Sequence, residues 1–154
     1  MKKYFLSLFL CCMCFFTLPV YASTPIDAKL GIPFEYTPPS GSVEELYKDM
    51  IVTQLTPYID AEIEKQYGQL LQYDLFDIKF LNIKRDAYRG FSFLLNLQVN
   101  PFVGAHNTIG IDNLTISITP SGTKVENFQH LKSFPIPPWL EESYKDLKTP
   151  PITK

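Results

Sequence analysis

Cysteine is missing from most of this 154-residue chain. All three cysteines, Cys11, Cys12 and Cys14, lie in an apolar N-terminal segment, and none follows it. A protein that has lost this segment has no disulfide, no thiol nucleophile and no thiolate metal site. The residues before these cysteines are not the small ones that precede a lipid-modified cysteine, so a lipid anchor is not expected.

Clustered positive charge is also missing. The chain has 14 Lys and Arg residues against 16 Asp and Glu residues, and it contains no basic run. Binding to nucleic acid depends on grouped Lys and Arg side chains that neutralise phosphates. We therefore expect no nucleic-acid partner.

The common catalytic motifs are absent as well. The sequence has no Gly-x-Ser-x-Gly elbow, no glycine loop that binds phosphate and no His-Glu-x-x-His pair. It has only two histidines, and no cofactor motif is recognised, so no cofactor is predicted. These absences favour a non-enzymatic protein over an enzyme.

The N-terminal segment has the features of an export signal. Lys2 and Lys3 precede an apolar run of 17 residues, 4–20, and Val20-Tyr21-Ala22 gives the small-x-small pattern of a cleavage site before Ser23. A retained membrane anchor is the alternative, although a span needs about 20 apolar residues. We expect residues 1–22 to be removed and the mature protein to be secreted, without a stable membrane span. Loss of the two lysines leaves 12 basic and 16 acidic residues, a formal charge of −4.

The remaining chain has the length of one domain. Residues 23–41 contain four prolines before Gly41 and predict an extended leader that forms neither helix nor ladder. Residues 42–133 have regular apolar periods and predict the folded domain. Residues 134–154 form a tail with a short helix, in which Leu140, Tyr144 and Leu147 share a face and Trp139 packs onto the domain.

A long amphipathic helix opens the domain. Ser42 and Glu45 form a capping box, and Gly68 is a stop signal. Either Pro57 kinks one helix, or Thr56 caps a second helix with the proline in its first turn. The apolar residues form two stripes, rotated from each other by roughly a third of a turn. The first stripe is Val43, Leu46, Tyr47, Met50 and Ile51, and the second is Leu55, Tyr58, Ile59 and Ile63.

Four segments after Gly68 alternate with period two and predict strands. The first spans residues 76–83 with a bulge near Phe80, and the second spans 91–99. The third spans 109–118 with a change of phase at Asp112-Asn113, and a Pro120-Ser121-Gly122 turn leads to the fourth. The sequence therefore predicts an α+β fold in which the long, Pro-kinked N-terminal helix packs on a four-stranded antiparallel sheet, cystatin-like or NTF2-like in outline.

The polar candidates for a site are His106, Asp112 and His130. Two imidazoles and a carboxylate can hold Zn²⁺ and leave one position for water, which would suit a small metal-dependent or acid-base hydrolase. Symmetric pairing about Ser121-Gly122 places Asn113 opposite His130, whereas a slip of one residue places Asp112 there. The metal hypothesis therefore depends on one step of register.

The alternative for the stretch 100–112 is a plain turn. In this interpretation Gly104 ends a strand, His106 lies in the turn, and Gly110 permits a close approach of backbone. A hydrogen bond between Asp112 and His130 then only satisfies a half-buried pair. We favour the turn and keep Gly104, His106, Asp112 and His130 as candidate binding residues.

Four fragments together resemble an uncharacterised family of small exported proteins of Bacillus-type bacteria, domain of unknown function 3888. They are "SVEELYKDMIVTQLTPYI", "EKQYG", "VNPFVGAHNTIGIDNLT" and "VENFQHLKS". The resemblance implies export and a helix followed by strands, and it implies no activity and no catalytic residue. We therefore expect an exported binding module with an unknown protein, peptide or cell-envelope partner.

Overall fold

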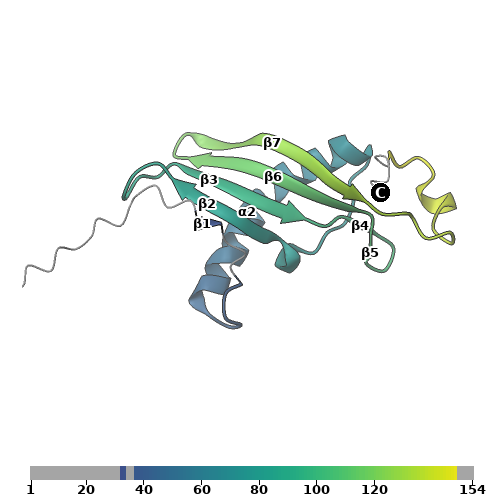
Figure 1. The fold of residues 1–154 in the computed structure, drawn as a ribbon, viewed down its shortest axis with the longest axis horizontal. Helices are drawn as coiled ribbons and strands as arrows, with labels where there is room; N and C mark the ends of the chain where they lie inside the picture. Colours follow the sequence, from purple (N-terminus) through teal and green to yellow (C-terminus); the bar gives the residue numbers. More distant parts are fainter. Residues whose placement is uncertain (1–31, 34–36, 149–154) are drawn as a thin grey trace, which may run out of the picture.

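The computed structural model describes residues 32–33 and 37–148. One long helix, α2 (Val43–Tyr67), lies against one face of an antiparallel sheet, so the fold is α+β (Figure 1). The expected export signal, residues 1–22, lies outside the described residues. Within the described ranges, none of the helices has the length and apolar character that a membrane span requires.

α2 begins and ends where the sequence predicts. The Ser42 hydroxyl accepts a hydrogen bond from the backbone N–H of Glu45 at 3.1 Å. The Glu45 carboxylate in turn accepts one from the N–H of Gly41 at 2.6 Å, one residue earlier than in the usual capping box. Gly68 ends the helix with a φ of 78°, a left-handed conformation that glycine adopts at little cost.

Pro57 does not divide the helix. α2 runs for 25 residues through it, so the alternative of two helices with Thr56 as a cap is wrong. Proline has no N–H to donate to the carbonyl of Thr53, and this weakens the turn. Leu55 and Ile59, on either side of the proline, are buried and hold the helix on the sheet across the interruption.

The two apolar stripes of α2 have different environments. The second stripe faces the sheet: Leu55, Ile59 and Ile63 are 1% exposed or less, whereas Tyr58 is only half-buried. Val52 and Tyr67, outside the predicted stripe, are buried to the same extent. The first stripe does not pack on the sheet, and its members are 37–59% exposed. The stripes point in different directions around the helix, so a single sheet face covers only one of them.

The sheet has four long strands, and every neighbouring pair is antiparallel. The order is β1-β2-β3-β6-β7, so each long strand pairs with the next long strand of the chain. The prediction that the leader forms no ladder is wrong at two residues, Ile32 and Pro33, which pair with one edge of the sheet, where proline is tolerated. The strands are β1 (Ile32–Pro33), β2 (Lys79–Arg85), β3 (Phe93–Val99), β6 (Gly110–Thr119) and β7 (Gly122–Ser133).

The predicted bulge in β2 is confirmed. Phe80 lies opposite Leu97, but Asn82 lies opposite Asn96, because the register shifts at Leu81. Phe80 therefore faces α2, whereas Asn82 faces the other side of the sheet, with Asn96. The extra residue reverses the alternation of the strand.

The predicted change of phase in β6 is wrong. Gly110, Asp112 and Leu114 are all buried in one continuous alternation, and Ile111 is only half-buried. The prediction failed because Asp112 occupies a core position that periodicity reserves for an apolar side chain. Hydrogen bonds stabilise the carboxylate at this buried position.

The tail packs partly as expected. Leu140, Tyr144 and Leu147 lie with the hydrophobic core. A three-residue 3-10 turn, η2 (Glu142–Tyr144), stands where the sequence predicts a short helix. The prediction for Trp139 is wrong, because this side chain is 76% exposed.

Candidate functional site

Asp112 and His130 lie opposite each other on β6 and β7, with His130 Nδ1 2.7 Å from Asp112 Oδ1. The β6–β7 turn pairs Thr119 with Gly122, and this register alone would leave the two side chains one position apart. A bulge at Glu126 adds one residue to β7 and brings His130 opposite the aspartate. The one-residue slip considered from the sequence therefore takes place.

Tyr67 joins this pair from the last turn of α2. Its hydroxyl donates a hydrogen bond to Asp112 Oδ2 at 2.9 Å and lies 3.5 Å from His130 Nδ1. The hydroxyl lies in the space that a β-carbon on residue 110 would fill. Gly110 is thus needed for the close approach of a tyrosine hydroxyl, and not of backbone as the sequence suggested.

The buried carboxylate determines the electrostatics of the cluster. Asp112 is fully buried, and this burial raises its pKa above the ordinary value, although hydrogen bonds from His130 and Tyr67 offset part of the effect. Burial, followed by the nearby Asp112 charge, also raises the pKa of Tyr67. Tyr67 is therefore a neutral hydrogen-bond donor at any ordinary pH.

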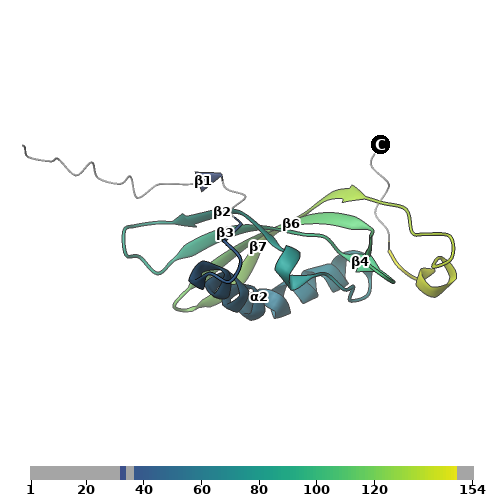
Figure 2. The ribbon, with the colours of Figure 1, turned by 90° about the horizontal axis from the view of Figure 1, so that it is seen from below.

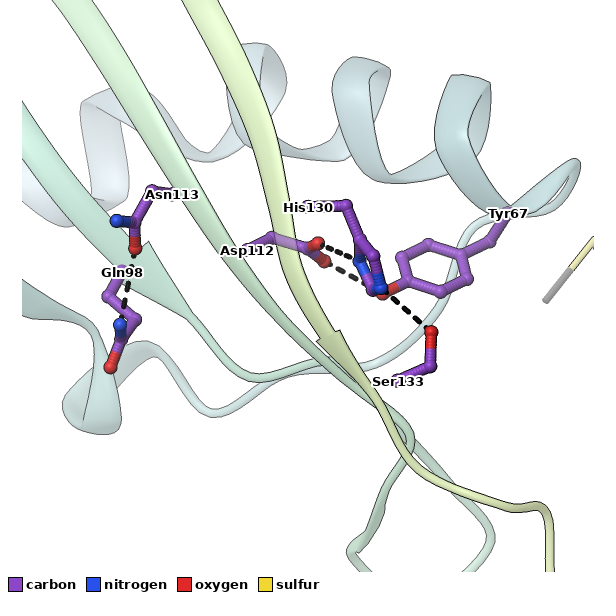
Figure 3. Close-up of polar contacts among 6 residues, drawn as sticks. All are labelled: Tyr67, Gln98, Asp112, Asn113, His130 and Ser133. Carbon is purple, nitrogen blue, oxygen red and sulfur yellow. Dashed lines mark hydrogen bonds and ion pairs between the residues drawn. The ribbon is translucent and has the colours of Figure 1, made fainter. Parts of the chain in front are cut away.

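The hydrogen bonds continue from His130 to the end of β7. His130 Nε2 lies 2.7 Å from Ser133 Oγ, while Nδ1 faces the carboxylate (Figure 3). A neutral imidazole that donates from Nδ1 to Asp112 accepts at Nε2 from the serine hydroxyl. The hydrogen bonds link the four side chains in the order Tyr67, Asp112, His130, Ser133, and the Tyr67 hydroxyl also lies beside the imidazole.

Carboxylate, imidazole and hydroxyl in this order are the groups of a serine hydrolase triad. Nucleophilic attack also requires a substrate at the hydroxyl and donors for the oxyanion. Ser133 is only 3% exposed and the His130 side chain 15%. The chain of hydrogen bonds is therefore closed to substrate in this conformation, and its evident role is to satisfy a buried carboxylate between helix and sheet.

His106 lies outside this polar cluster. Its Nδ1 lies 3.1 Å from Asp74 Oδ2, and its ring lies over Phe102 with centroids 4.4 Å apart. The side chain is 66% exposed, and the backbone has a positive φ of 61°. The turn interpretation of this stretch is confirmed, because residues 104–106 connect the short strands β4 (Phe102–Val103) and β5 (Asn107–Thr108).

Gly104 has two reasons to be glycine. Its φ is 55°, and a β-carbon there would lie 2.7 Å from Leu140 Cδ1. Its N–H donates to the Tyr144 hydroxyl at 3.2 Å, so the turn and the tail hold each other. Gly104 and His106 border an open groove of about 710 Å³ between this hairpin and residues 70–75.

The structure thus brings together two of the three residues of the alternative metal hypothesis, Asp112 and His130, and places His106 elsewhere. Within residues 32–33 and 37–148, no group of three or more His, Cys, Asp or Glu side chains is placed to hold a metal ion. His106 pairs with Asp74, whereas Asp112 and His130 pair with each other. The arrangement gives the hydrolase hypothesis no support.

Sequence reasoning missed Tyr67 and Ser133. The available signal for Tyr67 was its position four residues after Ile63, in phase with the buried stripe and directly before Gly68. Ser133 gave no signal beyond its distance of three residues from His130. Three of the four fragments behind the family resemblance contribute to the cluster, since "EKQYG" holds Tyr67, the central fragment holds Asp112, and "VENFQHLKS" holds the other two.

Comparison with known sequences agrees with the resemblance. The sequence model of a family described as "Protein of unknown function (DUF3888)" matches residues 47–132, more than half of the chain. No curated protein and no solved structure matches significantly. The match spans α2 from its second turn and all four long strands, and so includes every residue of the polar cluster except Ser133.

Proposed function

Because the chain belongs to the DUF3888 family of proteins of unknown function, we propose its function from geometry: a binding module that acts outside the cytoplasm and takes a protein partner on an exposed apolar face of α2. This N-terminal apolar face consists of Val43, Leu46, Tyr47, Met50 and Ile51. Its exposure is the observation that supports the proposal.

Exposed apolar side chains are usually scattered, whereas these five share one face of one helix. They follow the spacing i, i+3, i+4, i+7, i+8, and four of them are 57–59% exposed. Removing apolar surface from water contributes about 25 cal/mol per Å², so a helix face of this kind gains free energy when a partner covers it. The stability of the domain alone does not explain this exposed apolar face, because the sheet packs on the other half of α2.

The surroundings suit a partner protein. Lys48 Nζ donates to the Phe76 carbonyl at 3.3 Å, which holds the 3-10 turn η1 (Leu75–Asp77) beside this half of α2. Phe76 in this turn is 75% exposed. On another side, a depression of about 500 Å³ lies between Met50 and Ile118 and can receive a partner side chain. Apolar centres with charged edges are typical of protein interfaces.

Two further points support the remaining parts of the proposal. The N-terminal segment has the pattern of an export signal, which supports a location outside the cytoplasm. The buried Asp112 and Ser133 leave the polar cluster without access for a substrate, which supports binding over catalysis. The partner is therefore expected among secreted or envelope proteins.

The test is a capture experiment with a pair of matched variants. The full chain and a Leu46→Glu, Met50→Glu variant are incubated with the native secretome and cross-linked, and the captured proteins are identified. The control is Ala61→Glu, which adds the same kind of charge at an exposed position of the same helix. We expect one or a few proteins to be captured by the wild type and the control and lost with the double variant. Capture that is equal for all three proteins, or absent for all, contradicts the proposal.

A further inference from the structure

The face of the sheet opposite α2 has an unusual composition. Figure 2 shows α2 on one side of the sheet only, and no described α-helix lies on the other. Two adjacent cross-strand rows on that face consist largely of amides. One row is Asn82, Asn96, Thr115 and Asn127, and the next is Lys79, Gln98, Asn113 and Gln129, so a lysine ends the second row.

The residues of this surface are not those that stabilise strands. Asparagine is depleted in strands, whereas Thr, Val and aromatic residues are enriched. Yet Asn96 and Asn113 occupy the two central strands, and Asn82 and Asn127 occupy the strands beside them. Residues that break a local preference without a gain in stability are expected at functional sites.

The amides are only partly satisfied by one another. Thr115 Oγ1 donates to Asn96 Oδ1 at 2.9 Å, and Gln98 Nε2 donates to Asn113 Oδ1 at 3.2 Å. Within the described residues, Asn82 Oδ1 is one of only two buried side-chain N or O atoms without a hydrogen-bond partner. Buried polar atoms in native proteins are nearly always paired, with protein groups or with ordered water.

The rows also form a shallow depression. Its volume is about 280 Å³, just below the range for drug-sized ligands, and no charged side chain lines it. Leu81, the bulged residue of β2, gives it an apolar border. The polar lining is Asn82, Asn96, Asn113, Thr115, Asn127 and Gln129, which we name the amide surface.

We propose that the amide surface binds a neutral sugar unit of a glycan. Each amide presents a donor and an acceptor side by side, and each sugar hydroxyl also donates and accepts, so the two match in number and kind. Leu81 offers an apolar contact to the C–H side of a sugar ring. The lining of the depression contains no charged side chain that could pair with an anionic or cationic ligand.

This inference does not depend on the apolar face of α2. The two surfaces lie on opposite sides of the domain, so a glycan and a protein can be bound at the same time. A domain of this kind would hold its protein partner at a glycan. Failure of one surface in its own test leaves the other unaffected.

The experiment is an NMR titration of the purified full chain labelled with ¹⁵N, with the side-chain amide signals as readout. The probes are maltotetraose and tetra-N-acetylchitotetraose, both neutral, with tetragalacturonate as the charged comparison. We expect at least one neutral tetrasaccharide to shift the amide signals of the two rows, and tetragalacturonate to shift them much less. Weak binding is sufficient, since a few neutral hydrogen bonds contribute little net free energy.

Two variants and one control complete the test. Asn127 and Gln129 are exposed on β7, so Asn127→Ala with Gln129→Ala leaves the fold intact and should weaken binding about tenfold, the effect of two lost hydrogen bonds. Gln54→Ala removes an exposed amide from α2 and should leave binding unchanged. Absence of shifts with both neutral probes, equal shifts with tetragalacturonate, or shifts that survive the double variant would each overturn the proposal.

Discussion

The Tyr67 hydroxyl lies in the space that a β-carbon on Gly110 would occupy, and so the last turn of α2 and the first residue of β6 are compatible only because one of them has no side chain. This relationship allows Tyr67 to reach Asp112 Oδ2 at 2.9 Å. The pair therefore determines how the C-terminal half of the helix is positioned on the sheet.

The first prediction concerns this pair. Gly110→Ala should lower the free energy of unfolding by about 3 kcal/mol, because the methyl group overpacks a filled core and displaces the Tyr67 hydroxyl from Asp112. Tyr67→Phe in the same chain should recover part of the loss, since it removes the atom that clashes. Urea unfolding of both single variants and the double variant gives the coupling energy. Strictly additive effects would show that the clash is relieved elsewhere.

The second prediction is a pH dependence. Burial raises the pKa of Asp112 in the folded state, so the folded protein binds this proton more tightly than the unfolded chain. The resulting stability is fully present below the unfolded pKa of about 3.9 and is lost as the pH rises through the higher folded pKa. The difference in unfolding free energy between wild type and Asp112→Asn should therefore shift in favour of the wild type as the solution is acidified.

Urea titrations of both proteins between neutral pH and pH of about 3.5 measure this difference. Asparagine is a suitable comparison because its amide keeps the shape and can still accept from Tyr67. Asp112→Ala should destabilise by about 2 to 4 kcal/mol at neutral pH, because it leaves Tyr67 and His130 without their partner, and its loss should grow on acidification as for Asp112→Asn. If the difference between the wild type and the Asp112→Asn variant does not change with pH, the assigned direction of the pKa shift is contradicted.

The third prediction separates the two residues of the turn. Gly104→Ala should destabilise by 1 kcal/mol or more, as a rough lower limit, because φ is 55° and a β-carbon would lie 2.7 Å from Leu140 Cδ1. His106→Ala should stay within about 0.5 kcal/mol of the parent, since the side chain is 66% exposed and its ion pair with Asp74 is at the surface. Thermal unfolding of both variants is sufficient. A large loss for His106→Ala would mean that the side chain supports the core.

The fourth prediction compares two leucines of α2. Leu55→Ala should cost about 2 to 5 kcal/mol, because this side chain is 1% exposed and its loss leaves a cavity. Leu46→Ala should change stability by less than about 0.5 kcal/mol, because this side chain is 57% exposed and no described element covers it. Chemical unfolding of the isolated protein measures both. Equal losses would mean that the N-terminal apolar face is covered in solution even without a partner.

Local features were predictable because their causes are local. The capping box at Ser42 and the stop at Gly68 follow from backbone geometry within one turn, and both are confirmed. The bulge at Leu81 is visible as a change from one alternation to the other. The turn at His106 is similarly set by residues within a few positions.

The site could not be predicted in the same way. Burial of Asp112 depends on Tyr67, which is 45 residues away in sequence, and on His130, which is opposite only because of the bulge at Glu126. Periodicity assigned an apolar residue to that position, since it has no information about distant hydrogen-bond partners. The alternative metal hypothesis has no support for the same reason: His106 pairs with Asp74, and nothing in the spacing indicated that pairing.

The sequence by itself determined the class of fold, the extent of the helix and the four strands, because apolar period, caps and turn residues act over a few positions. It also contained both apolar stripes of α2 and all the amides of the outer sheet face. Only the tertiary structure decided which stripe the sheet covers, which polar residues meet inside and which amides gather on one surface. These depend on strand register and on the orientation of a long helix, where one added residue exchanges the buried and exposed sides.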